Sequence, residues 1–232
     1  MRIAIDGPAG SGKSTIGAAL ARALGYLYFD TGVMYRAVTI AALRRGIPLD
    51  EESVVTEISR NVLIEVRPPT PAENDGRQNT VLLDGEDVTW DMRTPAVDAS
   101  VSIPSAYRGV REAMVDQQRR IAAGGNLVMV GRDIGTVVLP RAEVKIYLTA
   151  TVEERAMRRH NELLARGRQS DYELVLSSMK ERDRLDSERA ESPLRRAPDA
   201  IRIDSTGLSP EEALEACLSV VRDRQRPATR PA

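Results

Sequence analysis

The residues whose types and spacing most clearly suggest a chemical role lie close to the N-terminus, in a glycine-rich run that ends in Lys-Ser-Thr. Their spacing, one glycine, four residues and then Gly-Lys-Ser, is typical of loops whose backbone N–H groups cradle phosphates. The Lys13 ammonium would reach the outer phosphates, and the Ser14 hydroxyl could ligate Mg²⁺. The expected phosphate-binding residues are Gly7, Pro8, Ala9, Gly10, Ser11, Gly12, Lys13, Ser14 and Thr15.

The segments on either side of this run have the order that a phosphate-binding loop requires. An apolar stretch from Arg2 to Asp6 predicts a strand, and the stretch from Thr15 to Leu24 predicts a helix that Gly25 ends. Only three of the 33 basic residues are lysines, yet one of them stands at position 13. A compact ammonium on a flexible stem suits that position better than a planar guanidinium. The context therefore favours a phosphate-binding loop over a solvated turn.

Composition excludes several other classes of protein. The formal net charge is −1 and aromatic residues make up only 3% of the chain, which argues against a nucleic acid partner. The single Cys217 and the single His160 exclude an intrachain disulfide and leave no Cys/His cluster for zinc. Any metal should therefore be a hard ion held by oxygen ligands and phosphates.

The distribution of apolar residues indicates in which compartment the protein is expected. No apolar run reaches the length of a membrane span, so we expect no membrane partner. Because the first predicted strand begins at the N-terminus, a secretory leader is not expected either. We expect a cytoplasmic monomer, and its 232 residues are enough to bury a sizeable core.

Alternating strands and helices predict an α/β fold with a parallel sheet. Strands are expected at 26–29, 126–130, 144–148 and 200–204, and helices at 33–45, 53–58, 107–123 and 209–222. Two further strands, 61–66 and 80–85, flank a proline-rich segment and interrupt this alternation. They predict a small antiparallel subdomain inserted in the α/β chain.

Two polar clusters follow predicted strands of the parallel sheet. Asp30-Thr31-Gly32 follows the strand at 26–29, and Gly131-Arg132-Asp133-Ile134-Gly135-Thr136 follows the strand at 126–130. Open α/β sheets bind ligands at the carboxyl ends of their strands, so both clusters are candidate site residues. Simpler interpretations remain open, since the first cluster could form a turn and helix cap, and Asp133 could cap the turn after Arg132.

A segment rich in both signs of charge lies between the last two strands. The stretches 153–165 and 172–189 predict two helices joined by Gly167–Ser170. Arg182, Asp186 and Arg189 share one helix face, where they could bind a phosphate or form an ordinary ion-pair ladder. For such composition alone, a solvated pair of helices without a ligand is the commoner outcome.

Several of these blocks together resemble the bacterial cytidylate kinase family of nucleoside monophosphate kinases. The first block marks any protein with this phosphate-binding loop, whereas Gly-Arg-Asp-Ile-Gly-Thr and Arg-Asp-x-x-Asp-x-x-Arg are specific to the family. The resemblance extends to about Arg224. The residues that carry it are Asp6–Thr15, Asp30–Arg36, Val110–Glu112, Gly131–Thr136 and Arg182–Arg189.

The resemblance implies a P-loop nucleoside monophosphate kinase fold, with a parallel sheet flanked by helices, a small antiparallel β insert and a helical lid. It implies one kinase domain over residues 1–224, with a monophosphate-binding insert at about 61–104 and a lid at about 152–171. The implied reaction is transfer of the γ-phosphate of ATP, with Mg²⁺, to CMP or dCMP. Residues 225–232, rich in proline and arginine, are expected to be a disordered tail.

The resemblance also implies residue roles. Thr31 and Asp186 would hold the nucleoside, and Ser102, Arg111 and Asp133 would read cytosine. Arg158, in the lid, would touch the donor phosphates. The residues expected around the acceptor phosphate are Arg36, Arg132, Arg182 and Arg189, and those expected to act in catalysis are Lys13, Arg132, Arg158, Arg182 and Arg189.

One position departs from the family's pattern. Similar proteins carry a carboxylate just before Gly-Arg-Asp, where this chain has Val130, which leaves Asp6 or Asp133 as the acidic groups near Mg²⁺. Two other functions stay open. The chain could phosphorylate another small acceptor, such as UMP, AMP or shikimate, or act as a P-loop ATPase or nucleotide-dependent switch.

Overall fold

A five-stranded sheet positions the glycine-rich loop. The computed structural model describes residues 1–225, so the expected tail, apart from Gln225, lies outside the described residues. The strands stand in the order β2-β6-β1-β7-β8, and β1 pairs in parallel with both β6 and β7. Their bounds are Arg2–Asp6 for β1, Leu27–Asp30 for β2, Leu127–Gly131 for β6, Val144–Thr149 for β7 and Ile201–Asp204 for β8. The predicted parallel sheet is confirmed.

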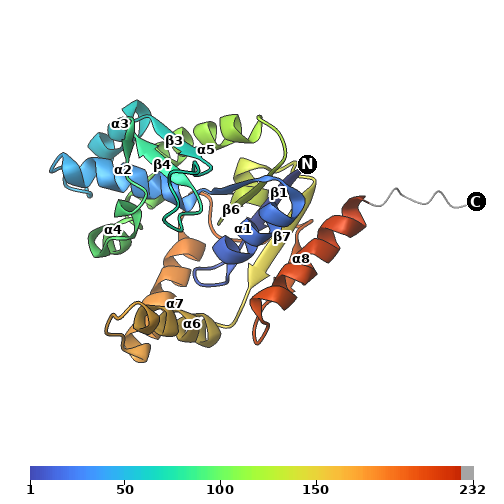
Figure 1. The fold of residues 1–232 in the computed structure, drawn as a ribbon. Coiled ribbons are helices and arrows are strands. Elements are labelled where there is room, and N and C mark those ends of the chain that lie inside the picture. The colour runs from blue at the N-terminus through green and yellow to red at the C-terminus, as the bar shows by residue number, and fades with distance from the viewer. Residues whose placement is uncertain (226–232) are drawn as a thin grey trace, which may run out of the picture. The chain divides into compact units, whose positions relative to one another are not determined.

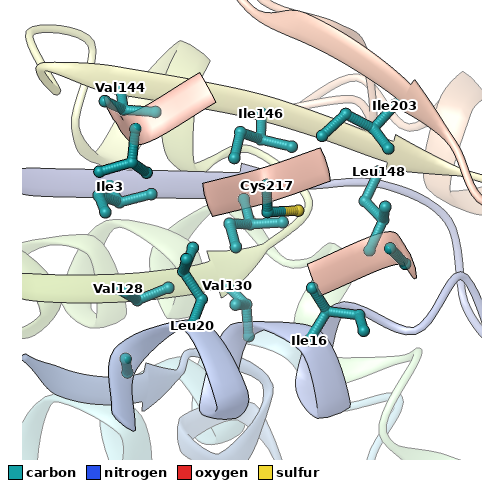
Figure 2. Close-up of a cluster of buried hydrophobic side chains, with 14 of the residues drawn as sticks. Ile3, Ile16, Leu20, Val128, Val130, Val144, Ile146, Leu148, Ile203 and Cys217 are labelled. Carbon is teal, nitrogen blue, oxygen red and sulfur yellow. The ribbon is translucent and has the colours of Figure 1, made fainter. Parts of the chain in front are cut away.

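Helices α1, Lys13–Leu24, and α8, Pro210–Gln225, cover one face of this sheet. Alternate residues of β1 and β7 point to that face, as the two-residue period of a strand requires. Figure 2 shows Ile16 and Leu20 of α1 and Cys217 of α8 against these strand residues. The strand side chains in this core cluster are Ile3, Ile5, Val128, Val130, Val144, Ile146, Leu148 and Ile203.

The charged segment forms the expected pair of helices. Helix α6 spans Val152–Ala165 and α7 spans Tyr172–Glu188, and the two lie side by side (Figure 1). Each begins at a residue whose side chain accepts a backbone N–H: Thr151 from Glu154 at 3.3 Å and Asp171 from Leu174 at 3.1 Å. The predicted helices are confirmed to within a residue at each end.

Among the described residues, 29–124 form a second compact unit beside the one made of 1–28 and 125–225 in the sequence. Its small sheet is antiparallel, in the order β3-β4-β5, which confirms the predicted insert. The strands are β3, Ile64–Arg67, β4, Thr80–Leu83, and β5, Glu86–Asp87. The helices are α2, Gly32–Arg44, α3, Glu52–Asn61, α4, Pro95–Ser100, and α5, Arg108–Ala122, with 3₁₀ turns η1, Asp91–Arg93, and η2, Pro104–Ala106.

The structure differs from the sequence expectations in short segments. The strand expected from residue 61 starts at Ile64, because α3 continues to Asn61, whose side chain bonds back to Glu57. Helix α4 begins at Pro95, a residue that also suits a loop, and so it was not predicted. After β6 the chain makes one π-type turn, η3, Ile134–Val138, closed by a 2.7 Å bond from Leu139 N to Ile134 O.

Within residues 1–225, none of the helices combines the length with the apolar character that a membrane span needs. The expectation of one kinase domain over 1–224 stays a prediction.

Candidate active site

The glycine-rich loop joins β1 to α1 and closes tightly on itself. Gly7, Gly10 and Gly12 have positive φ angles of 153°, 73° and 90°, which favour glycine. A Cβ on Gly7 would lie 1.9 Å from the carbonyl oxygen of Leu148, so no larger residue fits. The Lys13 ammonium donates to the Pro8 carbonyl at 2.6 Å. The loop has the geometry of a phosphate cradle with a lysine inside it.

Asp6, the last residue of β1, ties this loop to the segment that follows β6. Its two carboxylate oxygens accept from Ile134 N and Gly135 N, each at 2.7 Å. The pKa of Asp6 is raised to about 6, mainly by burial and to a smaller extent by Asp133. The two backbone N–H bonds and Lys13 lower this pKa but do not offset the effect of burial. Asp6 thereby fixes the position of Arg132 and Asp133 next to the start of the glycine-rich loop.

Asp133 was left open between a helix cap and a site residue. Its side chain makes no capping bond to η3; its backbone carbonyl instead accepts from Val137 N at 2.8 Å. The side chain of Asp133 therefore does not cap η3. Whether Asp133 reads a base stays a prediction.

Three of the four arginines expected at the acceptor phosphate gather around one carboxylate. Arg132 Nε donates to Asp186 at 2.8 Å, and Arg189 lies 3.8 Å from the same carboxylate. Burial pushes the pKa of Asp186 up, but Arg132, Arg182 and Arg189 outweigh it and hold that pKa below the usual value. A concentration of guanidinium groups on a mostly buried carboxylate is not a surface ion-pair ladder. It can bind an anion bidentately.

Arg158, whose contact with the donor phosphates stays a prediction, is bonded to the loop after β8. It donates to Ser205 O at 2.6 Å and to Glu154 at 2.9 Å. The Ser205 hydroxyl in turn donates to Ser11 O at 3.4 Å, so Arg158 reaches the glycine-rich loop through one residue.

Sequence reasoning missed Arg155, which contacts the glycine-rich loop directly. This side chain is 4% exposed and donates to Ala9 O at 2.9 Å, to Ala150 O at 3.0 Å and to Asp183 at 2.5 Å. The only signal was its place in the first turn of a helix that directly follows a predicted strand. Several arginines share that helix, and the sequence does not tell which of them faces the loop.

Four of the expected nucleoside-site residues belong to the unit 29–124. Thr31 precedes α2, and Arg36 donates to Asp98 of α4 at 2.7 Å. Arg111, on α5, is buried and donates to Ser105 O at 3.0 Å, while its guanidinium carbon lies 5.3 Å from the centre of the Tyr35 ring. Ser102 accepts a 3.0 Å bond on its carbonyl from the Ser105 hydroxyl, so Ser105 of η2 contacts both Ser102 and Arg111.

The packing of Val130 explains why this chain has an apolar residue where similar proteins carry a carboxylate before Gly-Arg-Asp. It lies in the apolar core cluster, and its Cγ1 is 2.6 Å from where a Cβ on Gly17 of α1 would be. The strand therefore presents a packing methyl group there and no carboxylate. Both oxygens of Asp6, one of the two proposed substitutes, already accept backbone bonds.

The comparisons with known proteins agree with this arrangement. A family model described as "Cytidylate kinase" matches residues 3–223. A cytidylate kinase of Geobacillus kaustophilus is 50% identical to this chain over 222 residues, which cover 96% of each protein. A cytidylate kinase of Herpetosiphon aurantiacus is 51% identical over 219 residues, which cover 94% of this chain and 93% of the relative.

Among solved structures, an uncharacterized protein from Eubacterium ventriosum superposes with a TM-score of 0.52 at 13% identity, over 97% of this chain and 99% of that one, which supports the fold alone. The family match reaches from β1 into α8 and includes the glycine-rich loop, the segment after β6 and the arginines of α7. This chain belongs to the cytidylate kinase family.

Proposed function

We propose that this chain transfers the γ-phosphate of ATP to the 5′-phosphate of CMP or dCMP, giving ADP and CDP or dCDP. The observation that carries the proposal is the family match over residues 3–223, together with close relatives named cytidylate kinase. The clustering of Arg132, Arg182 and Arg189 around Asp186 supports it independently, because an acceptor that is itself a phosphate needs such cations.

The donor phosphates bind in the glycine-rich loop. Backbone N–H groups from Gly7 to Thr15 cradle them, and the Lys13 ammonium neutralises charge on the outer ones. Arg158 acts from the lid at about 152–171. Mg²⁺, which enters with ATP, supplies further charge neutralisation, and the oxygen of Ser14, next to Lys13 in the first turn of α1, is the ligand that this chain offers it.

The acceptor nucleotide is held by the remaining residues. Arg36, Arg132, Arg182 and Arg189 bind its phosphate, Thr31 and Asp186 hold the sugar, and Ser102, Arg111 and Asp133 bind cytosine. The reaction needs no general base, since the attacking oxygen already belongs to an ionised phosphate. The protein aligns the two nucleotides in line and stabilises the charge that develops between them. Closure of the lid excludes water and suppresses hydrolysis of ATP.

The proposal includes a cytoplasmic monomer whose partners are small nucleotides, without nucleic acid or a membrane.

A substrate panel tests the proposal against its rivals. ADP release is measured with CMP, dCMP, UMP, AMP and shikimate as acceptors and with no acceptor. We expect the highest kcat/KM with CMP or dCMP and little ADP without an acceptor. A better rate with another acceptor would make this a different small-molecule kinase, and acceptor-independent ADP release would make it an ATPase or switch.

A further inference from the structure

Tyr147 lies at the carboxyl end of the sheet, beside the glycine-rich loop. Its neighbours on β7, Ile146 and Leu148, belong to the core cluster, so the Tyr147 ring points to the opposite face of the sheet. Asp6 is its partner in the register between β1 and β7 and points to that same face. On that face, Asp6 accepts hydrogen bonds from η3, the segment after β6. Tyr147 therefore lies beside the residue that holds this segment in place.

Parts of both candidate phosphate sites border this position. The carbonyl oxygen of Leu148, the next residue, lies so close to Gly7 that a side chain on Gly7 is excluded. Three residues after Tyr147, Ala150 O accepts from Arg155, which also binds Ala9 O and Asp183. On the other side of Asp6, Gly131 completes the row, and Arg132 follows it directly.

The charges of these neighbours act on the Tyr147 phenol. Burial raises its pKa, Asp183 and Asp6 raise it further, and Arg132 and Arg155 lower it, with a net increase over the usual value. The hydroxyl therefore keeps its proton at neutral pH and is a hydrogen-bond donor.

The Tyr147 hydroxyl makes no hydrogen bond to the described part of the chain. Among residues 1–225, no hydrogen bond to Tyr147 Oη is found, and the side chain is half-buried. Two arginines, Arg132 and Arg155, and two carboxylates, Asp6 and Asp183, lie close enough to the phenol to act on its charge, so the surroundings of this ring are not those of apolar packing alone. The mostly buried arginines around it prefer an anion, and a neutral donor can share that anion without adding to its charge.

We propose that the Tyr147 hydroxyl donates a hydrogen bond to a phosphate oxygen in the chain of phosphates that joins the donor to the acceptor. This makes Tyr147 a further catalytic residue, and it rests on the nucleotide kinase activity proposed above. Tyr147 lies between the glycine-rich loop, which binds the donor, and Arg132, which binds the acceptor. The hydrogen bond therefore forms best when both nucleotides are bound.

Tyr147→Phe tests this, because it removes the hydroxyl and keeps the ring. We expect kcat with CMP to fall about 10- to 100-fold, the usual range for a lost bond to a charged group, while KM for CMP changes little. Tyr26→Phe is the matched control. Tyr26 is half-buried against the core cluster on the other face of the sheet, and its variant should keep the activity of the unaltered protein.

A binding measurement separates the proposed bond from a packing effect. The probe is a bisubstrate compound in which adenosine and cytidine are joined through their 5′ carbons by five phosphates. We expect Tyr147→Phe to bind it about tenfold more weakly or worse, to bind CMP alone as the unaltered protein does, and to unfold at the same temperature.

Equal kcat and equal affinity for the bisubstrate compound in Tyr147→Phe and Tyr26→Phe would overturn the proposal for Tyr147 and leave the kinase activity standing. An unaltered protein that does not phosphorylate CMP would instead contradict the proposed function itself. A lower unfolding temperature with unchanged kcat would assign the hydroxyl to stability and overturn its catalytic role.

Discussion

Lys13 stands where the glycine-rich loop becomes α1, with its ammonium buried against the loop's own Pro8 carbonyl. Lys13→Ala removes the charge that we expect to reach the outer phosphates but leaves the glycines that shape the loop. We expect kcat/KM to fall by much more than tenfold, with the protein still folded by circular dichroism. Lys180→Ala, which removes an exposed lysine of α7, is the control and should be neutral. A loss of tenfold or less, about 1.4 kcal/mol, would mean that this loop is not the donor site.

We expect the choice of base to depend most on Asp133. Cytosine offers a 4-amino donor beside ring acceptors, whereas uracil offers a 4-keto acceptor that a carboxylate repels. Asp133→Asn should therefore narrow the preference for CMP over UMP, chiefly by losing activity with CMP. The check is kcat/KM for both nucleotides in both proteins, and an unchanged ratio would remove Asp133 from the base pocket.

Asp6 predicts a pH dependence of stability. Its pKa in the folded protein is about 6 and its unfolded value is near 3.8, so the folded protein binds this proton more tightly. The associated stability is fully present below pH 3.8 and is lost as the pH rises through 6. Relative to Asp6→Asn, the free energy of unfolding should fall by roughly 1 to 3 kcal/mol between pH 4 and pH 7. Urea unfolding at both pH values measures it, and a constant difference between the two proteins would show that Asp6 does not titrate in this range.

At the level of elements, α7 and the residue that ends it carry arginines in two different settings. Arg189 lies near the buried Asp186, while Arg184 pairs with Glu181 and Glu188 in solvent. Arg189→Ala should cost about 2 to 5 kcal/mol of transition-state stabilisation, as expected for a clamp on the acceptor phosphate. Arg184→Ala should leave kcat/KM nearly unchanged. Similar kinetics for the two variants would place Arg189 outside the site.

The longer elements could be predicted because their patterns are local. The continuous apolar run of β6 and the period of α5 are visible in the sequence, and the end residues differ by only one or two. Strand β5 has only two residues, too few for any pattern to show, and a single π-type turn has no hydrophobic period that would set it apart from a loop. The contact of Arg155 with Ala9 joins residues 146 positions apart, so spacing along α6 could not reveal it.

The whole molecule divides its candidate residues between two compact units. The unit of 1–28 and 125–225 contains the glycine-rich loop, Arg132, Asp133, Arg158, Arg182, Asp186 and Arg189, and the unit of 29–124 contains Thr31, Arg36, Ser102 and Arg111. Motif resemblance predicted both groups of residues, because each motif is a short run within one unit. No local pattern predicts that both groups act on one acceptor nucleotide, because the groups come from segments far apart in the sequence.

Transfer of label from γ-³²P-ATP tests the central claim most directly. The unaltered protein is incubated with labelled ATP, Mg²⁺ and CMP, and the products are separated. We predict that the label appears in CDP, at its terminal phosphate, and that omission of CMP leaves it in ATP. Label recovered as inorganic phosphate, with or without CMP, would contradict the assignment of this chain as a kinase of CMP.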